Sequence, residues 1–117
     1  MSKEKLYIFD TTLRDGAQTQ GVDFSIDDKE KISNSLDNLG VDYIEGGWPG
    51  ANPTDTEFFN KDHGFKNAKL TAFGMTKKSE HSAENDPMLA SLINSKSSSV
   101  CLFGKSWDFQ VDVALGI

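Results

Sequence analysis

The 117 residues include one cysteine, three prolines and two histidines, and no apolar run approaches the length that crosses a membrane. The single Cys101 cannot form an internal disulfide. The first five residues, MSKEK, lead into a short apolar run rather than the core of a signal peptide. These absences predict a cytoplasmic protein with no membrane partner.

Basic residues are also scarce. Twelve Lys and Arg stand against 18 Asp and Glu, which gives a net charge of −6. Because no basic cluster interrupts this balance, we expect no nucleic-acid partner. Hydrophobic residues make up 37% of the chain, and the mean hydropathy is −0.46. We therefore expect residues 1–117 to form a single ordered domain of modest stability.

Short apolar runs typical of strands recur along the chain, at residues 6–9, 41–44, 70–75 and 100–103. Helical signals lie between them. In residues 26–39, Ile32, Leu36 and Leu39 have helical spacing, and Gly40 follows as a terminator. This segment predicts an amphipathic helix that packs on a sheet.

Two further helices are predicted from their start signals. Thr54 and Glu57 have the spacing of a capping box, and Asp86 precedes Pro87 as a cap residue precedes a first-turn proline. The apolar residues expected to be buried are Phe58 or Phe59 in the second helix, and Leu89, Leu92 and Ile93 in the third.

The predicted order is β-α-β-α-β-α-β, with strand starts separated by 36, 28 and 29 residues. A (β/α)8 barrel of about 250 residues divides into eight units of roughly this size. The sequence thus predicts an α/β fold, the N-terminal half of a TIM barrel with four parallel strands and three crossover helices. A doubly wound open sheet has the same alternation and stays open as an alternative.

The densest polar cluster, residues 10–18 (DTTLRDGAQ), follows the first strand. The carboxyl ends of parallel strands form the ligand-binding rim of such folds. Arg14 offers a planar cation, and Asp15 a hard oxygen ligand for a divalent cation. From these residues alone, a surface turn with a solvated Arg14 is the favoured interpretation.

Residues 10–18 resemble the signature loop of the family that contains 3-hydroxy-3-methylglutaryl-CoA lyase, 2-isopropylmalate synthase, homocitrate synthase and citramalate synthase. Residues 41–53 (VDYIEGGWPGANP) and 103–109 (FGKSWDF) support the resemblance. Their form is most similar to that of citramalate synthases. The resemblance extends from about Tyr7 to Leu115.

This resemblance implies a metal-dependent Claisen condensation of acetyl-CoA with pyruvate or a related 2-oxo acid, in branched-chain amino-acid synthesis, by a homodimeric enzyme. It implies that Asp15 ligates a divalent ion, that Arg14 stabilises the enolate or keto oxygen, and that Gln18 lines the substrate pocket. Glu45 would orient groups or assist proton transfer. The alternatives within the family are 2-isopropylmalate and homocitrate synthesis.

Strand alternation predicts that Glu45 faces the barrel interior if Ile44 faces the helices. A purely structural salt bridge between Glu45 and Arg14 is the alternative role for this carboxylate. Gly46, Gly47 and Gly50 are expected to serve turns, because no phosphate-binding glycine motif is present.

Some positions depart from the family or stay undecided. The family supplies a His-x-His pair as metal ligands, whereas His63 and His81 are eighteen residues apart and are expected on the surface. Gln110 stands where the family more often has His. Cys101 is assigned to packing. The side chains that could meet a substrate carboxylate or only form the rim are Lys105 and Trp107.

Half a barrel would leave two bare sheet edges and an exposed apolar face. The expectation is therefore a truncated, inactive part of a synthase. A non-catalytic half-barrel that pairs with another chain is the alternative from a different functional class.

Overall fold

The computed structural model describes residues 3–116 and has the predicted α/β fold. Its four strands are β1 (Phe9–Asp10), β2 (Tyr43–Gly47), β3 (Lys69–Met75) and β4 (Ser99–Phe103). All neighbouring strands are parallel, and their order in the sheet is β1-β2-β3-β4. Consecutive strands in sequential order are those of half a (β/α)8 barrel, whereas a doubly wound sheet reverses its order at a switch point.

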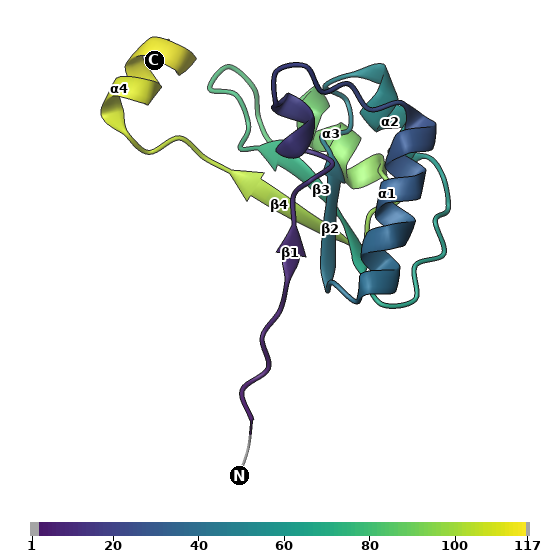
Figure 1. Cartoon of the computed structure of the whole chain (residues 1–117). Helices are drawn as coiled ribbons and strands as arrows, with labels where there is room; N and C mark the ends of the chain where they lie inside the picture. The colour runs from purple at the N-terminus through teal and green to yellow at the C-terminus, as the bar shows by residue number, and fades with distance from the viewer. Residues whose placement is uncertain (1–2, 117) are drawn as a thin grey trace.

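The crossover helices are α1 (Ile26–Leu39), α2 (Pro53–Phe59) and α3 (Pro87–Asn94), and they gather on one side of the sheet (Figure 1). Past β4, the short helical turns α4 (Asp108–Gln110) and η2 (Val111–Leu115) lie apart from them. The core lies between helices and sheet, where Ile44, Leu70 and Ala72 meet Phe58 and Leu92. Within residues 3–116, no helix is long and apolar enough to cross a membrane.

The first helix starts and ends as its sequence predicts. The Ser25 hydroxyl accepts a bond from the Asp28 amide, and the Asp28 carboxylate accepts one from the Ser25 amide, each at 3.0 Å. Gly40 ends the helix with φ 96°, a conformation that costs glycine little. The prediction that Leu39 faces the sheet was wrong, because this residue is 78% exposed. The buried positions of α1 are polar.

The other helices bring two corrections. Asn52, not Thr54, caps α2: its side-chain oxygen accepts a bond from the Asp55 amide at 2.8 Å, with Pro53 in the first turn. Asp86 caps α3 as predicted and accepts bonds from the amides of the first turn. Ile93 is 81% exposed, because α3 packs on β3 through Leu92.

The first strand is shorter than expected. Only Phe9 and Asp10 pair with β2, and residues 6–8 are exposed and extend away from the sheet (Figure 1). Pairing begins where β2 begins, with the Ile8 carbonyl accepting bonds from the Asp42 and Tyr43 amides. Residues before Ile8 have no strand alongside in the described part of the chain, so their apolar side chains stay exposed.

Candidate functional site

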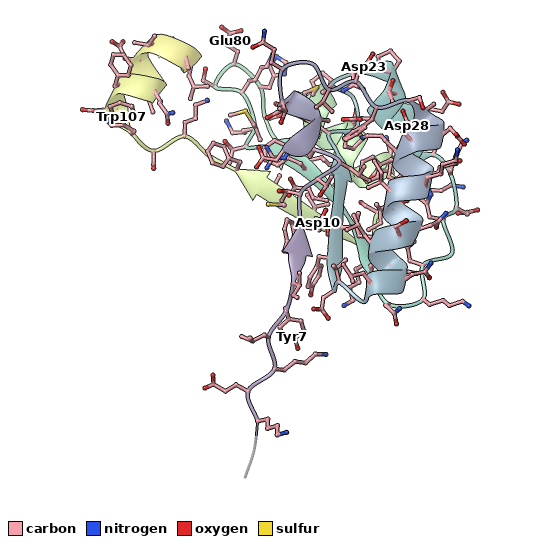
Figure 2. All side chains as sticks on the ribbon, viewed as in Figure 1. Tyr7, Asp10, Asp23, Asp28, Glu80 and Trp107 are labelled. Atoms are coloured by element: carbon pink, nitrogen blue, oxygen red, sulfur yellow. The ribbon has the colours of Figure 1, made fainter. Side chains whose placement is uncertain are left out.

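The loop after β1 is held in shape by its own hydrogen bonds. The Asp10 carboxylate accepts bonds from the backbone amide and hydroxyl of Thr12 at 2.9 and 3.1 Å, and the Thr11 carbonyl accepts the Asp15 amide at 2.7 Å. Leu13 is fully buried in the core. Figure 2 shows Asp10 at the upper end of β1 and the loop that runs on toward Asp23. Anchored by Leu13, the loop presents the adjacent Arg14 at the carboxyl end of the sheet.

Arg14 and Glu45 form the central contact of this site. The Arg14 Nε lies 2.5 Å from Glu45 Oε1, and the guanidinium lies 4.2 Å above the ring of Phe73. Glu45 is 1% exposed and Arg14 is 20% exposed. The alternation prediction is confirmed, because Ile44 lies in the helix-side core and Glu45 on the opposite sheet face. The guanidinium is thus clamped on one edge and one face, with limited access to solvent.

Gln18 joins Arg14 at a cleft of about 350 Å³ between the β1–α1 and β2–α2 loops. Gln18 belongs to the short helical turn η1 (Gly16–Gln18). The other lining residues include Lys29, Trp48 and Asp55. The structure therefore brings Arg14 and Gln18 to one cleft, with Glu45 beneath the guanidinium.

Asp15 is not among the residues that line this cleft. Its side chain is 64% exposed, and its nearest cationic atom is the Arg14 Nη1 at 3.8 Å. A divalent cation takes several ligands, and within residues 3–116 no three His, Cys, Asp or Glu side chains gather to hold one. The described residues thus supply one candidate ligand and do not fit a complete metal site.

The two histidines are less exposed than expected. His63 is half-buried: its Nε2 lies 2.7 Å from the Phe58 carbonyl oxygen, and its ring stacks on Phe65. His81 is also partly buried, and its Nδ1 has no hydrogen-bond partner in the described range. Both side chains were predicted on the surface, and both are partly covered in the structure.

Cys101 lies on β4 opposite Phe73 and is half-buried, in line with a packing role. Burial raises the pKa of its thiol, and the nearby Glu45 carboxylate raises it further. The thiol therefore stays protonated at neutral pH. Trp107 is exposed, and its ring lies 5.0 Å from that of Phe109, at a tilt of 38°, in the segment that lies apart (Figure 2). Neither Trp107 nor Lys105 lines the cleft.

Sequence reasoning missed three contributors to the site: Phe73, the pair Lys29 and Asp55, and the ring of Trp48. The parity of β3 could have identified Phe73, because Ala72 faces the helices. Nothing in the helical pattern marked Lys29, whose side chain is only 2% exposed. Gly46 and Gly47 belong to β2 itself, and Gly50 serves a turn with φ 90°.

Comparison with known proteins agrees with the fold. The HMGL-like family model matches residues 5–113. The chain is 54% identical over 114 residues to the (R)-citramalate synthase of Aquifex aeolicus, covering 96% of the chain and 22% of the relative. It is 47% identical over 119 residues to the (R)-citramalate synthase of Sulfolobus acidocaldarius, covering 100% of the chain and 23% of the relative.

A shorter match joins the chain to the 2-isopropylmalate synthase of Nitrosomonas eutropha, with 49% identity over 55 residues, 47% of this chain and 11% of the relative. The chain spans only about a fifth of the length of the curated synthases it matches. The family model covers nearly the whole chain, and the sheet order is that of the barrel. The chain therefore belongs to the HMGL-like family.

Proposed function

We propose that this chain forms the first half of the barrel of a synthase that condenses acetyl-CoA with pyruvate or a related 2-oxo acid. The observation that carries the proposal is the clamped Arg14 guanidinium at the carboxyl ends of the strands. In a Claisen condensation, negative charge develops on the enolate oxygen and then on the keto oxygen. A preorganised cation at that position stabilises the charge without reorganising.

The structure supports a division of roles among these residues. Glu45 accepts the Nε–H of Arg14, which leaves the Nη donors for a substrate oxygen. Because Glu45 is almost completely buried beneath Arg14, its geometry favours orienting the guanidinium over transferring protons to the substrate. Gln18 lines the same cleft and would contact the 2-oxo acid.

The family resemblance also implies a divalent ion, and Asp15 is the candidate ligand that we propose within this chain. Its exposed carboxylate is free to bind a cation, but the described residues place no group of three ligands around it.

Pyruvate is the preferred 2-oxo acid because of how the relatives match. The (R)-citramalate synthases align with 93–100% of the chain, whereas the 2-isopropylmalate synthases align with 46–51%. Similarity over nearly the whole chain is thus found for the citramalate synthases. We propose 2-isopropylmalate-type condensation as the second choice.

A chimera tests the proposal. This chain replaces the 114 aligned residues of the Aquifex aeolicus relative. Release of CoA from acetyl-CoA and pyruvate is then measured with a thiol reagent. We expect turnover in the chimera and a loss of about 10²–10³-fold in kcat for Arg14→Ala, the magnitude of a lost oxyanion donor.

The matched control is Lys31→Ala, which removes an exposed cation from α1. A folded chimera without turnover, or Arg14→Ala with the same kcat as its parent, contradicts the proposal. We also expect the 117-residue chain alone to release no CoA with added Mn²⁺ or Mg²⁺. Clear turnover by the isolated chain would contradict the expectation that it is inactive alone.

A further inference from the structure

Lys29 of α1 and Asp55 of α2 form a buried ion pair beside the site. The Lys29 Nζ lies 2.5 Å from Asp55 Oδ1 and 2.5 Å from the Gly46 carbonyl oxygen. The side chain of Lys29 is 2% exposed, and that of Asp55 is 13% exposed. A buried charge pair is a costly way to stabilise a fold, since apolar residues of the same volume serve as well or better. The location of the pair therefore calls for a functional explanation.

The pair holds the end of β2 on both sides of Gly47. Lys29 donates to the carbonyl of Gly46, and the Asp55 Oδ2 accepts the amide of Trp48 at 2.9 Å. The register of β2 against β3 shifts between Glu45 and Gly47, so the strand needs an outside partner there. Gly47 has φ 143°, and a Cβ at this position would meet the Asp55 carboxylate at 2.5 Å.

The segment held in this way contacts the site through aromatic rings. Trp48 packs edge-to-face on Phe73, with ring centroids 5.3 Å apart. The ring of Phe73 in turn packs against the guanidinium of Arg14. Glu45, the partner of Arg14, immediately precedes the held segment of β2.

From this chain of contacts we propose that Lys29 and Asp55 are positioning residues: they hold the Gly46–Trp48 segment so that Trp48, Phe73 and Glu45 keep Arg14 aimed at the substrate oxygen. The proposal rests on the proposed function for the identity of that substrate. Lys29 and Asp55 also line the cleft, and the role proposed for them acts through Arg14. Their effect is the direction of the Arg14 Nη donors.

The test uses the full chain with Trp107→Phe. Since the sequence has two tryptophans, this substitution leaves Trp48 as the single tryptophan. Lys29→Met removes the ammonium and keeps most of the side-chain volume. We expect a shift of Trp48 emission to longer wavelength and faster quenching by acrylamide. The Arg14 Nε–H resonance, which the short bond to Glu45 places downfield, is expected to move upfield.

The matched control is Asp27→Asn with Lys31→Met, which removes an exposed ion pair on the same helix. A folded Lys29→Met chain with unchanged Trp48 and Arg14 signals overturns the proposal. If Lys29→Met does not fold, Lys29→Met with Asp55→Leu removes both charges and the acceptor for the Trp48 amide. The same two signals must then change, and unchanged signals again overturn the proposal.

Activity provides a separate readout. In the chimera, Lys29→Met is expected to lower kcat by on the order of a hundredfold with little change in KM, the effect of a displacement of roughly 1 Å. If the parent chimera has no turnover but Lys29→Met still shifts both spectroscopic signals, the positioning role is supported and the synthase proposal is refuted. If the chimera turns over and Lys29→Met changes neither its kcat nor the two spectroscopic signals, only the positioning role is refuted.

Discussion

At the residue scale, the clamped guanidinium of Arg14 is the feature that most depends on its neighbours. Glu45 holds one edge, Phe73 supports one face, and Leu13 anchors the loop in the core. Alternation along β2 predicted the sheet face on which Glu45 lies. The ion pair with Arg14 was one of the two roles predicted for this carboxylate. The outward direction of Asp15 was not predictable, because neighbouring residues in a turn can face opposite ways.

Removal of Glu45 tests how strongly this contact supports the fold. Glu45→Ala is expected to lower the free energy of unfolding by about 3 kcal/mol, because it leaves a largely buried guanidinium without its carboxylate. Urea denaturation measures the change. Asp27→Ala, which breaks an exposed pair, is the control and is expected to have almost no effect. Equal stabilities for the two variants would contradict this view of Glu45.

Asp37 provides a pH test at a single residue. Burial by itself raises the pKa of its carboxyl, but bonds from the amides of Lys66, Ala68 and Asn67 outweigh this and lower it below 3.8. The stabilisation is then present above the unfolded value and is lost as pH falls through the folded value. The difference in the free energy of unfolding between the wild type and Asp37→Asn should shrink as pH falls below about 4, and urea denaturation measures it. A constant difference between the two would contradict the prediction.

At the scale of elements, helix positions were predictable and their contacts were not. The bounds of α1 match the predicted 26–39, because a capping box and a terminal glycine act locally. Its buried positions are Lys29, Ser33 and Asp37, which the apolar pattern alone could not identify. The partners of Lys29 and Asp37 come from β2, α2 and the loop before β3, so distant segments decide the burial of these two residues.

Asn52 and Thr54 are the two candidates for the N-cap of α2, and substitution distinguishes them. Asn52→Ala is expected to lower the free energy of unfolding by about 1 kcal/mol, since the Asp55 amide loses its acceptor. Thr54→Ala lies within the helix and is expected to have a smaller effect. Thermal or urea unfolding distinguishes them, and a larger loss for Thr54→Ala would restore the original capping assignment.

At the scale of the whole molecule, the helices cover one sheet face and leave other surfaces open (Figure 1). Val100 and Leu102 of β4 are exposed apolar residues. Within residues 3–116, neither β1 nor β4 pairs on its outer edge. Such edges and faces favour association with other chains.

We expect the isolated chain to self-associate heterogeneously, in proportion to its concentration, in size-exclusion chromatography with light scattering. Val100→Lys with Leu102→Lys should reduce the apparent mass, because it charges the exposed face of β4. Lys96→Met with Lys105→Met is the control away from that face. A single monodisperse dimer would instead favour the half-barrel that pairs with a second copy.

Local signals in the sequence determined the order of strands and helices, the ends of α1 and the position of the polar loop after β1. They act between residues a few positions apart, where turn chemistry and periodicity operate. Only the tertiary structure decided that Arg14 meets Glu45 and Phe73, that Asp15 faces solvent, and that Lys29 is buried against Asp55. These contacts join residues more than twenty positions apart in the sequence, and the packing of strands and helices alone brings them together.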